Sequence, residues 1–264
     1  MFKLGFGTLR TLRLISFVLI ALLPVASAAV GSIAVGVYSG RKQTLERLES
    51  VAIAKELAIN QWLDALHQEL TIVSTTDCAY ERMWVVLDLA QDELHYDFYN
   101  KAVRNRLRAF VGQSSLLDEL LLVDATGRVA LDTNPAGEGG DVGAAEYYLQ
   151  GLNGRFARLP FGDAAMPSQV TVTLPVVSGT GEVVGVIAGR ARIDTLVALL
   201  EDTTGLGDSG RAYLLSSGMG LLAGSPPPEG ATPGSQEALA GQAHGSASYT
   251  GGGGKPVIGV YRWL

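Results

Sequence analysis

The stretch Val172–Glu201, VTLPVVSGTGEVVGVIAGRARIDTLVALLE, contains the pattern that decides the fold. An alternating apolar strand reaches Gly179-Thr180-Gly181, where the glycines favour a tight turn. A second strand returns from the turn, and a helix follows from Asp194. Two strands joined by so short a turn run antiparallel, because a parallel pair needs a long crossover. The stretch therefore predicts an antiparallel sheet.

A second strand pair precedes this one in the chain. The segment LDELLLVDATGRVALDT, residues 117–133, has two apolar runs separated by a turn, to which Asp124 and Gly127 supply the turn chemistry. The segment EYYLQGLNG, residues 146–154, predicts a short helix that ends at glycine. Residues 118–193 are thus expected to hold four strands, with one helix inserted after the second strand.

The glycine pattern GLGDSG, residues 205–210, resembles a dinucleotide-binding fingerprint, but its context is reversed. That fingerprint needs a strand before it and a helix after it, so that the pyrophosphate meets a helix N-terminus. Here a helix precedes the glycines, and the strand RAYLLS follows them. We therefore expect a connecting loop and no cofactor.

Residues 204–264 repeat the plan of the preceding region. They read as a strand pair, a loop with the short helix SQEALAG, and a second strand pair that ends in VIGVYRWL. Because the chain stops within or directly after an apolar strand, we expect this second region to be truncated. Together the two regions predict an α+β fold with two small antiparallel-sheet lobes.

A long helix is expected over residues 41–76, ahead of the first lobe. Apolar residues recur every three or four positions from Leu45 to Leu70, with one break at Lys55. Such a helix can serve as a core helix of the lobes or pair with a second copy of the chain. The sequence favours neither use over the other.

The N-terminal region predicts a membrane helix. No charged residue occurs from Leu14 to Gly40, and about 20 apolar residues suffice to span a bilayer. A cleaved signal peptide is the alternative, since basic residues precede the run and Ala26-Ser27-Ala28 resembles a cleavage site. We expect an uncleaved span over residues 14–38. The basic residues 1–13 then lie in the cytoplasm and everything after about residue 40 lies outside the cell membrane.

Charge and residue usage disfavour several classes of function. The chain carries a net charge of −6, although its first 40 residues are basic. An acidic exterior argues against nucleic-acid binding. The single Cys78 excludes an intramolecular disulfide, and the three scattered histidines have no metal-ligand spacing. No nucleophile motif or carboxylate pair is present, so we assign no catalytic residue and no metal.

The order of these segments resembles the extracellular double Cache domain of bacterial transmembrane receptors. The resemblance covers residues 41–264 and is carried by the segments LDELLLVDATGRVALDT, EYYLQGLNG, VTLPVVSGTGEVVGVIAGRARIDTLVALLE, GLGDSGRAYLLSSGMGLLA and VIGVYRWL. It implies a stalk helix (41–76), a membrane-distal PAS-like lobe (77–203) that binds a small molecule, and a membrane-proximal PAS-like lobe (204–264).

The resemblance also implies an output. The signal would pass through the long helix, as a homodimer, to a cytoplasmic module. A histidine kinase of a two-component system is the first choice, and a chemoreceptor rod or a nucleotide cyclase is the alternative. Two other classes stay open, namely an extracytoplasmic hydrolase and a partner-binding ectodomain with a filled core.

The resemblance further implies candidate ligand contacts. Amino-acid sensors of the family have an Arg-x-Trp-Tyr cluster on the lobe's helix and an aspartate on a later strand. Here Ala145 replaces the arginine, an aromatic pair is kept, and Arg190 stands at the aspartate's position. Arg190 and Arg192, two apart on one strand, are expected to share a face and to favour an anion. The expected ligand-binding residues are Tyr147, Tyr148, Asp163, Arg190 and Arg192.

Overall fold

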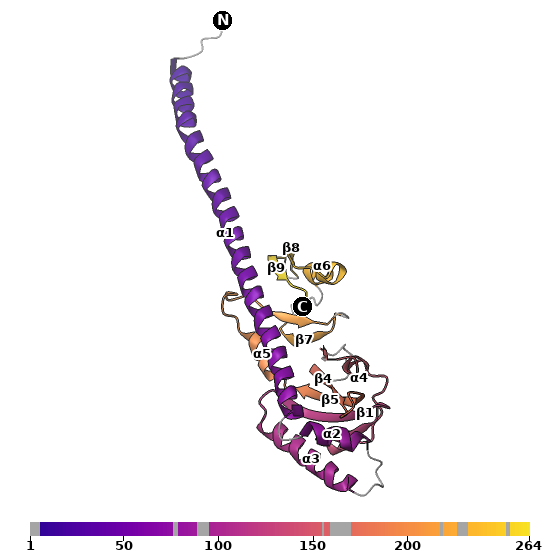
Figure 1. Ribbon diagram of the computed structural model, residues 1–264. Helices are drawn as coiled ribbons and strands as arrows, with labels where there is room; N and C mark the ends of the chain where they lie inside the picture. The colour runs from indigo at the N-terminus through magenta and orange to yellow at the C-terminus, as the bar shows by residue number, and fades with distance from the viewer. Residues whose placement is uncertain are drawn as a thin grey trace. The chain divides into compact units, whose positions relative to one another are not determined.

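The computed structural model (Figure 1) describes residues 6–75, 79–88, 95–154, 156–158, 170–216, 219–225, 232–251 and 254–264. Side chains are described within these ranges except at residues 6–26, 30, 34, 79–81 and 156–158. The chain forms two compact units, residues 1–50 and residues 51–264.

The first unit consists of the N-terminal part of helix α1 (Phe6–Thr75). Among the described residues, no helix has a stretch long and apolar enough to cross a membrane. Most of the span expected over residues 14–38 falls on side chains outside that description, so the span stays a prediction. The described part of that range exposes Ile33, Val35, Val37 and Tyr38, each by at least 60%.

The second unit is built around a five-stranded antiparallel sheet, as the sequence predicted. Its strand order is β2-β1-β5-β4-β3. The strands are β1 (Leu117–Asp124), β2 (Val129–Asp132), β3 (Phe156–Arg158), β4 (Val170–Val177) and β5 (Val183–Ala191). The short β3 was not expected from the sequence.

The turn between β1 and β2 uses the residues that the sequence indicated. Asp124 Oδ1 accepts hydrogen bonds from the backbone N–H groups of Thr126 at 2.8 Å and Arg128 at 3.0 Å. Gly127 has φ +89, and a Cβ at that position would lie 2.3 Å from the Cα of Gly143. Only glycine meets both conditions.

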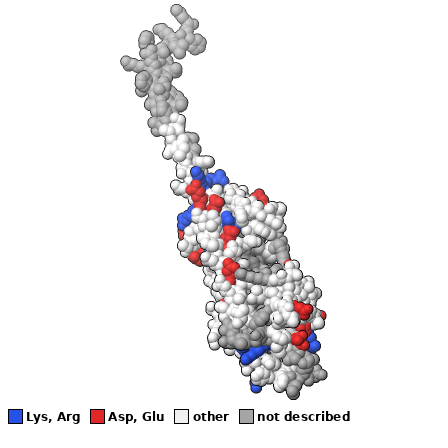
Figure 2. Space-filling view, viewed as in Figure 1, with Lys and Arg blue, Asp and Glu red and all other residues white. Residues whose placement is uncertain are grey.

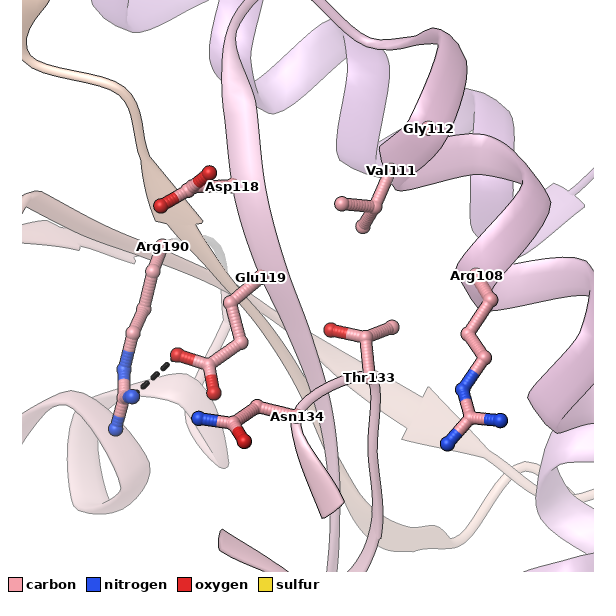
Figure 3. Close-up of a pocket in the computed structure, with 8 residues that line it drawn as sticks. All are labelled: Arg108, Val111, Gly112, Asp118, Glu119, Thr133, Asn134 and Arg190. Atoms are coloured by element: carbon pink, nitrogen blue, oxygen red, sulfur yellow. Dashed lines mark hydrogen bonds and ion pairs between the residues drawn. The ribbon is translucent and has the colours of Figure 1, made fainter. Parts of the chain in front are cut away.

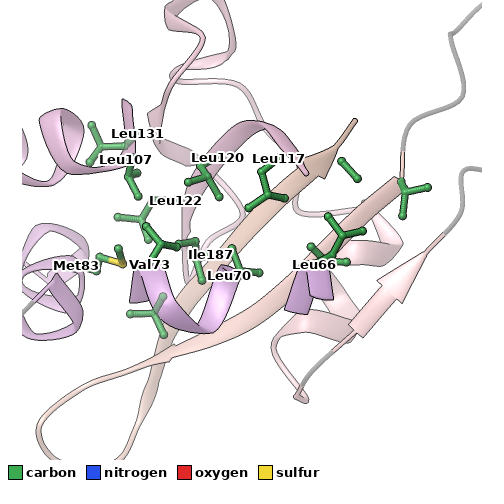
Figure 4. Packing of buried hydrophobic residues seen from close by; sticks show 14 of the residues in the cluster. Leu66, Leu70, Val73, Met83, Leu107, Leu117, Leu120, Leu122, Leu131 and Ile187 are labelled. Carbon is green, nitrogen blue, oxygen red and sulfur yellow. The ribbon is translucent and has the colours of Figure 1, made fainter. Parts of the chain in front are cut away.

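Helices α2 (Ala79–Asp88) and α3 (Tyr96–Gln113) lie on one side of the sheet, and the short α4 (Glu146–Gly151) lies on the other (Figure 1). The main core forms under α1, α2 and α3. Figure 4 shows its packing, with these fully buried side chains among its members: Leu66, Leu70 and Val73 of α1, Met83 of α2, Leu107 of α3, Leu117, Leu120 and Leu122 of β1, Leu131 of β2 and Ile187 of β5.

The long helix therefore serves as a core helix between Ile59 and Val73, which confirms one of the two uses considered for it. The break in its apolar pattern also has a structural reason. Lys55 Nζ donates hydrogen bonds to the backbone oxygens of Leu199 at 2.6 Å and Asp202 at 2.9 Å. These carbonyls lie at the C-terminal end of helix α5 (Asp194–Glu201), where carbonyls lack helical partners and attract a cation.

The region after α5 has the predicted order of hairpin, helix and hairpin. It contains β6 (Tyr213–Leu215), β7 (Leu221–Gly224), α6 (Pro233–Gly241), β8 (Gly245–Thr250) and β9 (Pro256–Tyr261). Within the described residues, the two hairpins form separate two-stranded sheets rather than one sheet. Arg262, directly after β9, forms an ion pair with Glu56 of α1.

Replacing Lys55 tests its contacts with the end of α5. Lys55→Met keeps the aliphatic stem and removes the donated hydrogen bonds. We expect the free energy of unfolding to fall by about 1.5–3 kcal/mol, the range for hydrogen bonds to a charged group. Urea unfolding followed by circular dichroism measures the change. Lys101→Met, at an exposed position on α3, is the control, and an equal loss in both variants would contradict the assigned role.

Candidate functional site

The face of the sheet opposite the main core carries the candidate site. A small apolar cluster lies there under α4, formed by Leu121, Val123, Val129, Tyr148, Val186 and Ala188. Toward one end of the sheet this face becomes polar. Glu119 of β1 is paired with Arg190 of β5, and Asp132 of β2 is paired with Leu121. Glu119 and Leu121 lie two apart on β1 and therefore share a face. Residues paired across neighbouring strands share that face too, so Glu119, Arg190 and Asp132 lie on the same side of the sheet.

A β-bulge in β1 makes this arrangement possible. Leu117 pairs with Ala191 and Glu119 pairs with Arg190, so Asp118 is an extra residue in β1. In a regular strand, Leu117 and Glu119 would point to the same face. The bulge lets Leu117 enter the main core while Glu119 enters the polar face.

Glu119 and Arg190 form an ion pair across the two central strands, as the dashed line in Figure 3 shows. The Glu119 side chain is largely buried and Arg190 is half-buried. The charge of Arg190, which was expected to favour an anion, is matched by Glu119 in this structure.

Asp132 is a buried carboxyl group at the same end of the sheet. It is 2% exposed, and its Oδ1 accepts a hydrogen bond from the Asn134 N–H at 2.7 Å. Burial raises its pKa from 3.8 to about 6; the Asn134 hydrogen bond opposes the rise, and the neighbouring Glu119 adds to it. Asp132 Oδ2 and Glu119 Oε1 are buried and accept no hydrogen bond from the described part of the chain.

Tyr147 of α4 lies next to Glu119, Asp132 and Arg190. Burial raises the pKa of its hydroxyl, and the nearby Arg190 guanidinium opposes the rise. The buried Thr173 donates a hydrogen bond from Oγ1 to the Tyr147 backbone oxygen at 3.4 Å, which fixes α4 on β4. We call Glu119, Asp132, Tyr147 and Arg190 the polar cluster.

The other expected site residues lie elsewhere. Tyr148 is buried in the apolar cluster, and its hydroxyl donates to the Asp124 backbone oxygen at 3.0 Å. Arg192 follows the last residue of β5 and is exposed, with its Nε 3.4 Å from Oδ1 of Asp118. Asp163 is outside the described residues. The structure therefore brings together Tyr147 and Arg190, and places Tyr148 and Arg192 apart from them.

Sequence reasoning missed Glu119 and Asp132. Asp132 lies on the edge strand β2, where a polar side chain is ordinarily exposed, but its side chain is buried. Glu119 was not singled out. The available signal was an acidic residue inside an otherwise apolar strand, LDELLLV, where a buried carboxyl needs a partner or a function.

An open cleft of about 470 Å³ reaches the ion pair from the side of α3. Figure 3 shows Glu119, Arg190 and Asn134 on one side of it and Arg108 on the other. Thr133 and Gly112 also line it. The cleft therefore gives a small molecule access to Glu119 and Arg190 of the polar cluster.

Arg104 and Glu138 form a second ion pair next to the polar cluster. Burial would raise the pKa of Glu138, but hydrogen bonds from Arg104 hold it below its usual value. One of these joins Arg104 Nη2 and Glu138 Oε2 at 3.1 Å. Glu138 Oε1 also accepts from the Asp132 N–H at 3.2 Å. Arg104 thus matches Glu138 and leaves Asp132 without a cation of its own.

Figure 2 shows charged side chains on the surface of the molecule, where their interactions differ from those within the polar cluster. On that face, Asp and Glu side chains lie close to Lys and Arg side chains in small mixed groups. Exposed pairs of this kind interact weakly because water screens them. The buried carboxyls of the polar cluster interact much more strongly with any charge nearby.

The chain has the fold of bacterial sensor domains. Solved structures with similar folds include the ligand-binding domain of the Campylobacter jejuni chemoreceptor Tlp3 with L-norvaline (TM-score 0.56, 13% identity, 83% of this chain, 86% of that one). They also include the ligand-binding domain of the Pseudomonas fluorescens chemoreceptor CtaA with L-serine (TM-score 0.52, 20% identity, 83% of this chain, 89% of that one). A third is the extracellular domain of rpHK1S-Z16, assigned as a histidine kinase (TM-score 0.54, 15% identity, 86% of this chain, 90% of that one).

These similarities confirm the fold that the Cache resemblance implied, and identities of 20% or less show the fold alone. No protein-family model and no curated protein matches the sequence.

Asp132 makes stability depend on pH. Its folded pKa lies above the unfolded value, so the folded state is disfavoured as pH rises through 4 to 6, and the cost persists above pH 6. Asp132→Asn keeps the Oδ1 acceptor and removes the charge. We expect it to stabilise the protein at pH 8 by on the order of 2 kcal/mol, and to change stability little at pH 4.

Denaturant unfolding at a series of pH values measures this effect. Glu182→Gln, which removes an exposed carboxylate from the β4–β5 turn, is the control. A pH profile of Asp132→Asn that is parallel to the unmodified chain would contradict the buried charge.

Proposed function

We propose that this chain is a membrane-anchored, extracytoplasmic sensory domain that binds a small molecule at the polar cluster and signals to a cytoplasmic output module. One observation carries the proposal. Buried carboxylate oxygens of Glu119 and Asp132 without hydrogen-bond donors lie on the sheet face under α4, and Glu119 and Arg190 line an adjoining cleft. Buried polar groups without partners are costly, so their presence favours a binding role over a structural one.

The similar structures support this interpretation. Tlp3 and CtaA are chemoreceptors whose ligand-binding domains were solved with L-norvaline and L-serine. This chain has the same fold and a polar cluster within it. We propose that it likewise binds a small organic molecule.

The N-terminal run supports the membrane anchor. Its uncharged stretch from Leu14 to Gly40 is long enough to span a bilayer as a helix. The exposed Ile33, Val35, Val37 and Tyr38 suit a lipid environment better than water. We propose the orientation expected from the basic N-terminus, with residues 1–13 in the cytoplasm.

Contacts of α1 offer a route for the signal. β5, which carries Arg190, leads into α5, and the end of α5 is held by Lys55. The next residue, Glu56, pairs with Arg262 beyond β9. A ligand that moves Arg190 therefore acts on an element in direct contact with α1.

We propose that the output module is a histidine kinase, with a chemoreceptor or a nucleotide cyclase as the alternative. Dimerisation through α1 belongs to the same proposal. Ile53 and Leu57 lie one turn apart on α1 and are both exposed, which suits a helix pair.

A matched pair of tyrosine variants tests the proposed site. Tyr147→Phe removes a hydroxyl from the polar cluster and is expected to weaken ligand binding about tenfold with little loss of stability. Tyr148→Phe removes the hydrogen bond to Asp124 and is expected to lower stability by about 1 kcal/mol without changing affinity.

Ligands for this test come from a thermal-shift screen of the full chain against amino acids, carboxylates, amines and purines. Isothermal titration calorimetry then gives the affinities. A screen in which no compound raises the melting temperature would favour a partner-binding ectodomain. Equal affinity losses in both variants would move the site away from Tyr147.

A further inference from the structure

The two buried oxygens that lack hydrogen-bond donors belong to neighbouring carboxyl groups, on Asp132 of β2 and Glu119 of β1. The two side chains act on each other both as charges and as hydrogen-bond partners. Within the described part of the chain, Asp132 Oδ2 and Glu119 Oε1 have no donor, and their residues are 2% and 9% exposed. Two ionised carboxylates only accept hydrogen bonds, so neither satisfies the other. A single proton on Asp132 satisfies both oxygens, because the neutral acid donates to Glu119.

The surroundings of Asp132 are packed closely by segment 134–137, which contains the single 3-10 turn η2 (Pro135–Gly137). A Cβ at Gly137 would lie 2.0 Å from Asp132 Oδ2, so the backbone of the segment lies directly over this oxygen. Asp132 Oδ1 accepts a hydrogen bond from the Asn134 N–H at 2.7 Å. The cleft is lined by Glu119 and not by Asp132. A proton fits between the two carboxyl groups because it needs no cavity.

The charged and titratable groups that face Asp132 come from four parts of the lobe. They are Glu119 from β1, Arg190 from β5, Tyr147 from α4 and Glu138 after β2. Arg190 is matched by Glu119, and Tyr147 stays protonated over the neutral range. Glu138 stays ionised in its ion pair with Arg104. Burial raises the pKa of Asp132 to about 6, and Glu119 adds to the rise. Asp132 is therefore the group of this set that changes charge between pH 5 and 7.

We propose that one proton shared by Asp132 and Glu119 holds segment 134–137 against the sheet, and that loss of this proton releases the segment. An ionised Asp132 gains from contact with water, which reaches the buried oxygen when the segment lifts. Asn134, the first residue of the segment, also lines the cleft. Acid therefore orders one wall of the cleft, and a higher pH loosens it. The use of this response in sensing rests on the proposed function, whereas the proton site does not.

Hydrogen exchange of backbone amides in the full chain, with no organic ligand added, tests the release of the segment. The Asn134 N–H is the most direct reporter, because it is bonded to Asp132. Exchange rates at pH 5 and pH 7.5 are corrected for the intrinsic effect of pH on exchange. We expect opening of the segment to be about tenfold more frequent at pH 7.5, which follows from a pKa of about 6 in the closed segment and 3.8 in the open one.

Asp132→Asn ties the effect to the shared proton. Its amide keeps the Oδ1 acceptor and supplies a permanent N–H donor for Glu119, so it stands in for the protonated acid. We expect this variant to exchange slowly at both pH values, while the control Glu182→Gln keeps the tenfold change. A tenfold change that persists in Asp132→Asn, or equal opening of the unmodified chain at both pH values, would overturn the proposal. Neither result affects the proposed ligand binding, which the thermal-shift screen tests separately.

Discussion

The ion pair between Glu119 and Arg190 is the interaction on which the rest of the site depends. It joins the two central strands of the sheet, on the face that α4 covers. It exists because the bulge at Asp118 turns Glu119 away from the main core. The pair neutralises the one arginine of the polar cluster, and Asp132 is thereby left as an unmatched buried charge. The pH response of the folded state follows from that imbalance.

The two faces of the five-stranded sheet contribute differently to the free energy of folding. Under α1, α2 and α3 the sheet buries a continuous set of leucines and other apolar side chains, which supplies the favourable free energy of folding. Under α4 the apolar cluster is small, and it borders buried carboxylate oxygens without donors. Proteins tolerate such costs mainly where function requires them. The large core on one face thus permits a binding site on the other.

The sequence predicted the fold well because the fold is encoded by local patterns. The alternation in residues 170–177, the turn at Asp124 and Gly127, and the apolar spacing of α1 each specify an element, and all three are confirmed. The site was predicted less well, because it depends on register. Tyr147 and Arg190 were identified, but Glu119 reaches the same face only through a bulge, which no local pattern reveals. The burial of Asp132 likewise depends on how residues 134–138 pack over it.

The most direct measurement is the carboxyl titration of Asp132 by carbon-13 NMR, with the signal assigned by its absence in Asp132→Asn. The account predicts a pKa of about 6 for the chain alone. A pKa near the ordinary value of 3.8 would contradict the account.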